Sequence, residues 1–141
     1  MIDLRASVDA WCQSYVTAFS SYEAQAIGAH WSFPAVLISG DRNISFATKD
    51  QFNQNTEALL GFYRKVGVAG ARRNLFDVFS MGQGTVAISA ADEMLDASGQ
   101  VITSWQSSYV LRQHGSSWLA VMANANGELA AWSARGTPLG R

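Results

Sequence analysis

The sequence predicts an α+β domain, because helix-like and strand-like periods occupy different halves of the chain. In the first half, apolar residues recur every three or four positions, with one short hairpin as an interruption. Four strand-like segments fill the second half, and Gly-containing turns separate them. Since short connections join antiparallel neighbours, we expect these segments to form an antiparallel meander.

The first predicted helix begins after Asp3, whose carboxylate is a suitable N-cap. Its apolar stripe follows helical steps and comprises Leu4, Val8, Trp11, Tyr15, Phe19 and Tyr22. A shorter helix is expected over 23–31. It has to end before Pro34, because proline disfavours a helical conformation in the residue that precedes it.

A hairpin and a third helix are expected next. Two apolar runs, 35–39 and 44–46, flank turn-forming residues at 40–43. Thr48 and Gln51 have the spacing of a capping box, which predicts the start of the helix. Gly67 is a suitable C-terminal stop.

The strands of the second half are predicted at 72–79, 85–95, 101–112 and 118–123. The chain after Glu128 shows no clear period. We therefore expect one domain over 1–141, with a core of about 3–125 and a tail at 126–141.

The last predicted strand is apolar on both faces. Leu119, Val121 and Ala123 alternate with Trp118, Ala120 and Met122. Because an antiparallel sheet commonly has one solvated face, this pattern predicts a homodimer that packs through the outer sheet face.

Composition excludes several classes of partner. Ten Lys and Arg residues against eleven Asp and Glu residues leave a formal charge of −1, so no nucleic-acid partner is expected. No run of about 18 apolar residues exists, so no membrane span is expected. A single cysteine forms no internal disulfide, and the N-terminus lacks a signal-peptide pattern. These features predict a cytoplasmic protein.

Metal and cofactor sites are not expected either. The chain has two histidines and one cysteine, without the local spacing of metal ligands. A Gly82-x-Gly84-x-x-Ala87 match to the dinucleotide fingerprint leads into a strand-like segment, whereas that motif must open a helix. It is therefore interpreted as a turn.

Several segments spread over about 3–125 carry a family resemblance. They are 15–19 in the first helix, 30–34 followed by 36–38 at the entry to the first strand, and 109–112 with 118–121 in the last two strands. Together they resemble the nuclear transport factor 2-like superfamily, which includes SnoaL-like polyketide cyclases and ketosteroid isomerases. The resemblance implies a cone in which a curved antiparallel sheet wraps three N-terminal helices around an apolar pocket, and it implies that dimers are common.

That superfamily hosts isomerases, dehydratases, cyclases, epoxide hydrolases and non-catalytic binders, so the fold alone does not give the function. Ser39 stands where ketosteroid isomerase-like members keep a general-base carboxylate. Asp41, two residues further, lies in the predicted turn. A steroid isomerase is therefore not favoured.

Two residues are candidates for proton transfer. Strand alternation places Val86, Ile88, Ala90, Asp92 and Met94 on one largely apolar face, so Asp92 is expected to point into the cone. The alternative is a solvated Asp92, or one paired with Arg72 or Arg73. His30, at the entry to the first strand, is the second candidate, because imidazole serves as acid or base near neutral pH. Its alternative is a structural role.

Candidate ligand-binding residues come from the same elements. Arg72 and Asn74 share one face of their strand and are expected to meet Asp92 at the mouth of the cone, although the period equally allows the face of Arg73 and Leu75. Tyr15, Trp31, Trp105 and Tyr109 are candidates for the pocket wall, with core packing as the alternative.

The function expected from these observations is binding of a small apolar or aromatic molecule by a SnoaL-like domain. The reaction expected of an enzyme of this kind is cofactor-independent isomerisation, cyclisation, dehydration or hydrolysis. The alternative is a non-catalytic ligand-binding or dimeric interaction module of the same fold.

Overall fold

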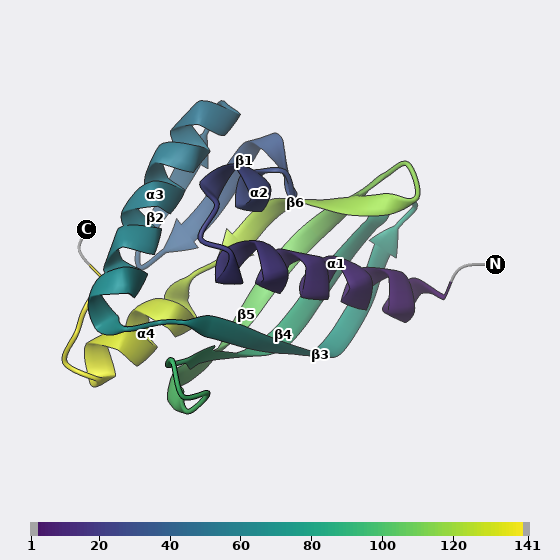
Figure 1. The fold of residues 1–141 in the computed structure, drawn as a ribbon. Helices are drawn as coiled ribbons and strands as arrows, with labels where there is room; N and C mark the ends of the chain where they lie inside the picture. Colours follow the sequence, from purple (N-terminus) through teal and green to yellow (C-terminus); the bar gives the residue numbers. More distant parts are fainter. Residues whose placement is uncertain (1–2, 140–141) are drawn as a thin grey trace.

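The computed structural model describes residues 3–139, in which helices and strands follow the expected order and one further helix is added (Figure 1). The elements are α1 (Leu4–Ser20), α2 (Ala24–Gly28), β1 (Trp31–Ser39), β2 (Arg42–Phe46), α3 (Lys49–Val66), β3 (Gly70–Gly82), β4 (Thr85–Leu95), β5 (Val101–His114), β6 (Ser117–Asn124) and α4 (Asn126–Ala134). The α+β prediction is confirmed.

The predicted helix boundaries at 3, 48 and 67 are confirmed by their capping interactions. The Asp3 carboxylate accepts a hydrogen bond from the Arg5 backbone N–H at 3.2 Å, and Thr48 Oγ1 accepts one from the Gln51 N–H at 3.3 Å. Gly67 ends α3 with a φ of 84°, a left-handed conformation that suits glycine.

The boundary between α2 and β1 was predicted wrongly. The helix ends at Gly28 and the strand already begins at Trp31 rather than at residue 35. Pro34 is tolerated inside β1 because the pairing of β1 with β6 is irregular between Trp31 and Val36, so the missing N–H breaks no regular ladder.

The six strands form one curved sheet in the order β2-β1-β6-β5-β4-β3, and α1 lies across its concave side (Figure 1). Successive strands from β3 to β6 pair antiparallel, as predicted. However, β1 and β6 run parallel, so the sheet is not purely antiparallel. The long connection through β2, α3 and the meander makes a parallel pairing sterically accessible.

The edge strand β3 is held by α1. Arg5 Nη2 donates a hydrogen bond to the Leu75 carbonyl at 2.8 Å, and Gln13 Nε2 donates one to the Arg73 carbonyl at 3.1 Å. Backbone carbonyls at a sheet edge otherwise lack protein partners. The helix therefore fixes the part of β3 that carries Arg73.

The core lies between the helices and the concave side of the sheet. Its largest fully buried side chains come from the helices and from β4 and β5: Val8, Cys12, Ile27, Leu60, Val86, Ile88, Leu111 and Trp132. Of the helices that the structure describes, none is long and apolar enough to cross a lipid bilayer.

Helix α4 closes one end of the cone, although its sequence shows no clear period. The Trp132 side chain is fully buried, with its ring centroid 5.2 Å from that of Phe62 and 6.1 Å from that of Tyr63. At Gly127, a Cβ atom would overlap the Gln106 carbonyl oxygen and lie 3.4 Å from Trp105 Cβ. Tertiary contact thus holds this helix against β5.

The outer face of the sheet carries an apolar row. Register pairs Phe79 with Ala87, Ala87 with Val110, Val110 with Met122, and Met122 with Val36. We call these five residues the outer stripe. Phe79 is 65% exposed. On one side of the outer stripe, the neighbouring row of paired residues across the sheet is polar. It consists largely of Asp77, Ser89, Ser108 and Asn124.

Gly127→Ala is expected to lower the free energy of unfolding by about 1–3 kcal/mol, because the added methyl group overlaps a backbone oxygen of β5. Gly61→Ala is the matched control. Its Cβ would meet nothing within 4 Å on α3, so a gain of about 0.5–1 kcal/mol is expected there. Urea unfolding measures both. Equal stability of Gly127→Ala and wild type would contradict the close packing of α4 on β5.

Candidate functional site

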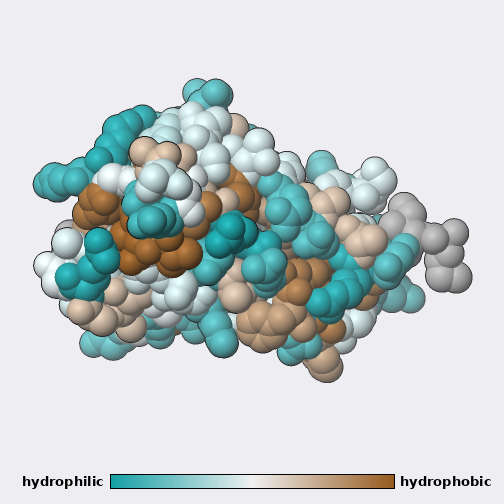
Figure 2. All heavy atoms as spheres, turned by 60° about the horizontal axis from the view of Figure 1, so that its bottom comes forward, coloured by the Kyte–Doolittle hydropathy of each residue, from teal (hydrophilic) through white to brown (hydrophobic). Residues whose placement is uncertain are grey.

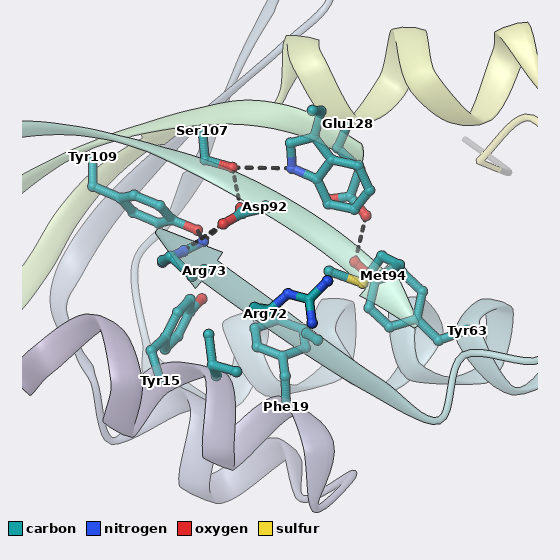
Figure 3. A pocket seen from close by; sticks show the side chains of 13 residues that line it. Tyr15, Phe19, Tyr63, Arg72, Arg73, Asp92, Met94, Ser107, Tyr109 and Glu128 are labelled. Atoms are coloured by element: carbon teal, nitrogen blue, oxygen red, sulfur yellow. Dashed lines mark hydrogen bonds and ion pairs between the residues drawn. The ribbon is translucent and has the colours of Figure 1, made fainter. Parts of the chain in front are cut away.

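A cavity of about 50 Å³ lies between α1, α3, α4 and the strands β3, β4 and β5 (Figure 3). Its wall comprises Tyr15, Val16, Phe19, Tyr63, Ala71, Arg72, Arg73, Asp92, Met94, Trp105, Ser107, Tyr109 and Glu128. A second cavity of about 80 Å³ adjoins it. Both share Tyr15, Phe19, Trp105, Ser107, Tyr109 and Glu128 as walls. Apolar side chains also gather on the surface over α3 and α4, with hydrophilic ones around them (Figure 2).

A buried ion pair forms one wall of the cavity. Arg73 on β3 is directly opposite Asp92 on β4 in the ladder. Arg73 Nε donates to Asp92 Oδ1 at 2.6 Å and Nη2 donates to Oδ2 at 2.8 Å, and the two side chains are only 6% and 5% exposed. This two-point geometry fixes the plane of the guanidinium group.

Two further side chains orient the carboxylate. Ser107 Oγ donates a hydrogen bond to Asp92 Oδ2 at 2.6 Å, and Trp105 Nε1 donates to Ser107 Oγ at 3.0 Å. Asp92 therefore accepts three hydrogen bonds, two of them from Arg73. The arrangement makes Asp92 a residue that holds Arg73 in place.

Arg73 has donor capacity left over. Nη2 also donates to the Tyr109 hydroxyl at 2.8 Å, and the guanidinium lies 4.7 Å and 5.5 Å from the ring centroids of Tyr109 and Tyr15. Nη1 is buried, and no residue among 3–139 accepts a hydrogen bond from it. Burial of such a group without an acceptor is costly, so it marks a place for a ligand oxygen or a water.

The phenols of Tyr15 and Tyr109 keep their protons at neutral pH. Burial raises the pKa of Tyr109 to about 12, and burial also holds the pKa of Tyr15 well above its usual range. Tyr109 Oη accepts from Arg73, and Tyr15 Oη accepts from Trp31 Nε1 at 2.9 Å. Within the described part of the chain, neither hydroxyl proton has an acceptor. Arg73, Tyr15 and Tyr109 all line the first cavity. We call Arg73 Nη1 and the two hydroxyls the donor wall.

The opposite side of the cavity carries a carboxylate (Figure 3). Glu128 Oε2 accepts hydrogen bonds from the Tyr63 hydroxyl and from Trp132 Nε1, the latter at 3.1 Å. Burial, together with the charge of Glu128, holds the pKa of Tyr63 well above its usual range, so Tyr63 is the donor in this pair. These hydrogen bonds thus join α3 to α4 at this point.

Asp92 is buried on the inner face of β4, and it is paired with Arg73, which was one of the alternatives that the sequence left open. Among the aromatic candidates, Tyr15, Trp105 and Tyr109 line both cavities, and Trp31 lines the second one. A role of any of them in ligand binding stays a prediction.

The prediction that Arg72 and Asn74 meet Asp92 is wrong. Arg72 is 54% exposed and pairs with Glu93 at 2.7 Å, so it reaches only the rim of the cavity. Asn74 is exposed and lines neither cavity. The strand register places Arg73 opposite Asp92 instead. The alternation along β3 allowed either the face of Arg72 or the face of Arg73 to point inward, and the structure shows that it is the face of Arg73.

His30 was expected to act inside the pocket, and the structure places it outside. Its Nδ1 lies 2.8 Å from the Ala26 carbonyl oxygen, and its Nε2 lies 2.8 Å from Ser14 Oγ. Because a carbonyl only accepts, Nδ1 is the donor to the Ala26 oxygen. The ring lines neither cavity. It joins α1 to α2.

Sequence reasoning missed Glu128, Tyr63 and Ser107 as site residues. Glu128 lies in the predicted tail at 126–141, and Tyr63 belongs to an ordinary helix stripe. No three His, Cys, Asp or Glu side chains of residues 3–139 come together in a way that could hold a metal ion.

Comparison with known proteins assigns the chain to a family. A family model described as NTF2-like protein (DUF6841) matches residues 5–127. The chain belongs to this NTF2-like family. The superfamily inferred from the sequence resemblance is thereby confirmed. No curated protein matches the chain significantly.

Solved structures show the same NTF2-like fold at low sequence identity. A ketosteroid isomerase-like protein from Erwinia carotovora atroseptica SCRI1043 superposes with a TM-score of 0.63 at 20% identity, covering 84% of this chain and 92% of that one. An NTF-2 like protein of unknown function from Shewanella oneidensis MR-1 has a TM-score of 0.66 at 8% identity, with coverage of 85% and 96%. A candidate scytalone dehydratase from Novosphingobium aromaticivorans DSM 12444 has a TM-score of 0.63 at 6% identity, with coverage of 85% and 80%.

The NTF2-like protein is expected to lose stability in alkaline solution above pH 10. An unfolded tyrosine ionises at about pH 10, whereas burial raises the pKa of Tyr109 to about 12. The stabilisation from this raised pKa is therefore complete below pH 10 and is lost as the pH rises toward 12. Urea unfolding at successive pH values measures the loss, and Tyr109→Phe should reduce it. Tyrosinate absorbance that reaches its full value near pH 10 in the folded protein would contradict the burial of these phenols.

Proposed function

We propose that this NTF2-like protein binds a small, largely apolar molecule through one oxygen atom and catalyses acid/base chemistry next to that oxygen. The observation that carries the proposal is the donor wall. Arg73 Nη1 and the hydroxyls of Tyr15 and Tyr109 are three donors without a protein acceptor among residues 3–139, and they belong to residues that line one cavity together with several aromatic rings.

The chemistry of the donor wall favours an oxygen that carries or gains negative charge. One donor is a permanent cation, and the other two are neutral phenols. The Asp92 carboxylate and Ser107 hold the guanidinium before any ligand arrives, so little reorganisation is needed when charge develops. Donors fixed in this way stabilise an enolate or phenolate oxygen strongly in a water-poor site.

The size of the site favours a single-ring molecule. The two adjoining cavities have about 50 and 80 Å³ of room. Since one water needs about 10–15 Å³ on this measure, together they hold on the order of ten non-hydrogen atoms. A substituted cyclic ketone or a phenol fits this estimate, whereas a four-ring steroid exceeds it.

The reaction classes that suit such a site are isomerisation, dehydration and cyclisation through an enolate. The names of the ketosteroid isomerase-like and scytalone dehydratase neighbours are in keeping with this proposal. In our proposal, Asp92 positions Arg73 rather than transferring protons. The alternative is a non-catalytic module that uses the same donor wall to hold a phenol or carboxylate.

A second copy of the chain is the partner we propose for the outer stripe. Five apolar residues in direct register cross five strands, and Phe79 in this row is mostly exposed. Contact of two such stripes would bury apolar area on both copies. A cytoplasmic location stays a prediction of the sequence.

Tyr15→Phe and Tyr109→Phe are each expected to weaken binding of 4-nitrophenol by about 5- to 30-fold, since each removes one neutral hydrogen-bond donor worth about 1–2 kcal/mol. Titration calorimetry gives the affinities, and the near-ultraviolet spectrum shows whether the phenolate is bound. Tyr22→Phe is the matched control, because the Tyr22 hydroxyl donates to the Val68 carbonyl outside both cavities. Equal affinity in all three variants would contradict the donor wall as a binding site.

Val110→Arg is expected to shift the protein from dimer to monomer, because it places a charge in the middle of the outer stripe. Sedimentation velocity at micromolar concentration measures the state. Val101→Arg serves as the control, since Val101 is also exposed but lies at the start of β5, away from the stripe. A wild-type protein that sediments as a monomer would contradict the dimer.

A further inference from the structure

We infer that the ligand of this protein carries a second oxygen, in a neutral hydroxyl group, and that this group binds to Thr56 of α3 in the second cavity. The inference rests on the proposed function, because it takes the first oxygen of the ligand to be held at the donor wall. It narrows the ligand from any small apolar phenol or ketone to one with a polar group at each end of an apolar ring.

Thr56 is a buried polar residue without a structural partner. Its exposure is only 3%, and it lines the second cavity but not the first. A helical threonine can donate its hydroxyl to the carbonyl one turn earlier, as Thr17 does to Gln13 at 3.0 Å. The Thr56 hydroxyl makes no such bond, and it has no hydrogen-bond partner among residues 3–139. Since buried hydroxyls in proteins are nearly always paired, this one offers a binding position inside the cavity.

Aromatic side chains lead from the donor wall to Thr56. The ring centroid of Trp31 lies 6.2 Å from that of Tyr109 and 4.8 Å from that of Phe52. Phe52 precedes Thr56 by one turn of α3, and these four residues all line the second cavity. The N–H of Trp31 already donates to the Tyr15 hydroxyl at 2.9 Å. The wall between the two polar positions therefore suits an apolar ring.

The chemistry around Thr56 favours an uncharged group. Of the residues among 3–139 that line the second cavity, none is Lys, Arg or His. A ligand carboxylate would therefore be buried there without a cation, which is costly. The neighbouring Asn55, partly buried, lines the same cavity and is also uncharged. A hydroxyl both donates and accepts hydrogen bonds, so it can pair with the Thr56 hydroxyl in either direction.

Titration calorimetry with two phenols of nearly the same shape tests the inference. In 4-(2-hydroxyethyl)phenol a hydroxyl stands where 4-propylphenol has a methyl group, and each molecule has about ten non-hydrogen atoms, as many as the two cavities hold. We expect the wild-type protein to bind 4-(2-hydroxyethyl)phenol at least as tightly as the more apolar 4-propylphenol, because the latter leaves Thr56 unpaired. Tighter binding of 4-propylphenol, or of the anionic 4-hydroxyphenylacetate, would overturn the inference.

Thr56→Val keeps the β-branched shape and removes the hydroxyl. We expect it to weaken binding of 4-(2-hydroxyethyl)phenol by about 3- to 10-fold and to change that of 4-propylphenol by less than about twofold. Thr56→Ser keeps the hydroxyl and should retain the wild-type order of the two affinities. Thr17→Val is the matched control, because it also removes a threonine hydroxyl from a helix. Thr17 is exposed and lines neither cavity, so both affinities should stay unchanged.

Urea unfolding separates ligand binding from a structural role of Thr56. Because the hydroxyl has no partner among residues 3–139, Thr56→Val should be at least as stable as wild type. A less stable Thr56→Val that binds both phenols more weakly to the same extent would overturn the inference, as would unchanged affinities. Wild-type protein that binds 4-nitrophenol but fails these comparisons overturns the inference alone. Failure of the wild type to bind 4-nitrophenol overturns the proposed function and the inference together.

Discussion

The ion pair of Arg73 and Asp92 is the constraint on which the rest of the cavity depends. Two charges with only 6% and 5% exposure are costly to bury, and their attraction offsets that cost only when geometry and further hydrogen bonds are nearly ideal. The β3–β4 register meets the first condition by placing the two residues opposite each other. The further hydrogen bonds come from β5, which carries Ser107, Trp105 and Tyr109. Three neighbouring strands are thus tied together by one polar network.

The same network determines what the cavity can hold. Arg73 uses three donor positions on Asp92 and Tyr109, and its Nη1 is buried without an acceptor among residues 3–139. The aromatic rings of Tyr15 and Tyr109 lie 5.5 Å and 4.7 Å from the guanidinium. The ligand that we propose, an apolar molecule with one electron-rich oxygen, matches both features, because its ring would contact the aromatic side chains and its oxygen would accept from the remaining donors.

Much of the fold follows from local sequence signals, and the site follows from them only in part. Asp3, Thr48 and Gly67 act within one helical turn, so their capping roles could be predicted. Asp92 could also be placed, because β4 lies inside the sheet and alternates regularly. Arg73 could not be distinguished from Arg72, because β3 is an edge strand whose pairing shifts between Leu75 and Asp77. The position of His30 depends on a tertiary partner, because its ring bonds to Ser14 of α1. The position of α4 does so too, because Trp132 packs on Phe62 and Tyr63 of α3.

Residues that serve the two sides of the cavity belong to separable stretches of chain. Arg73, Asp92 and Tyr109 lie inside the stretch shared with the NTF2-like family, whereas Glu128 and Trp132 follow it directly. Replacing the residues of α4 would therefore change the Glu128 side of the cavity without touching the residues of the Arg73–Asp92 ion pair.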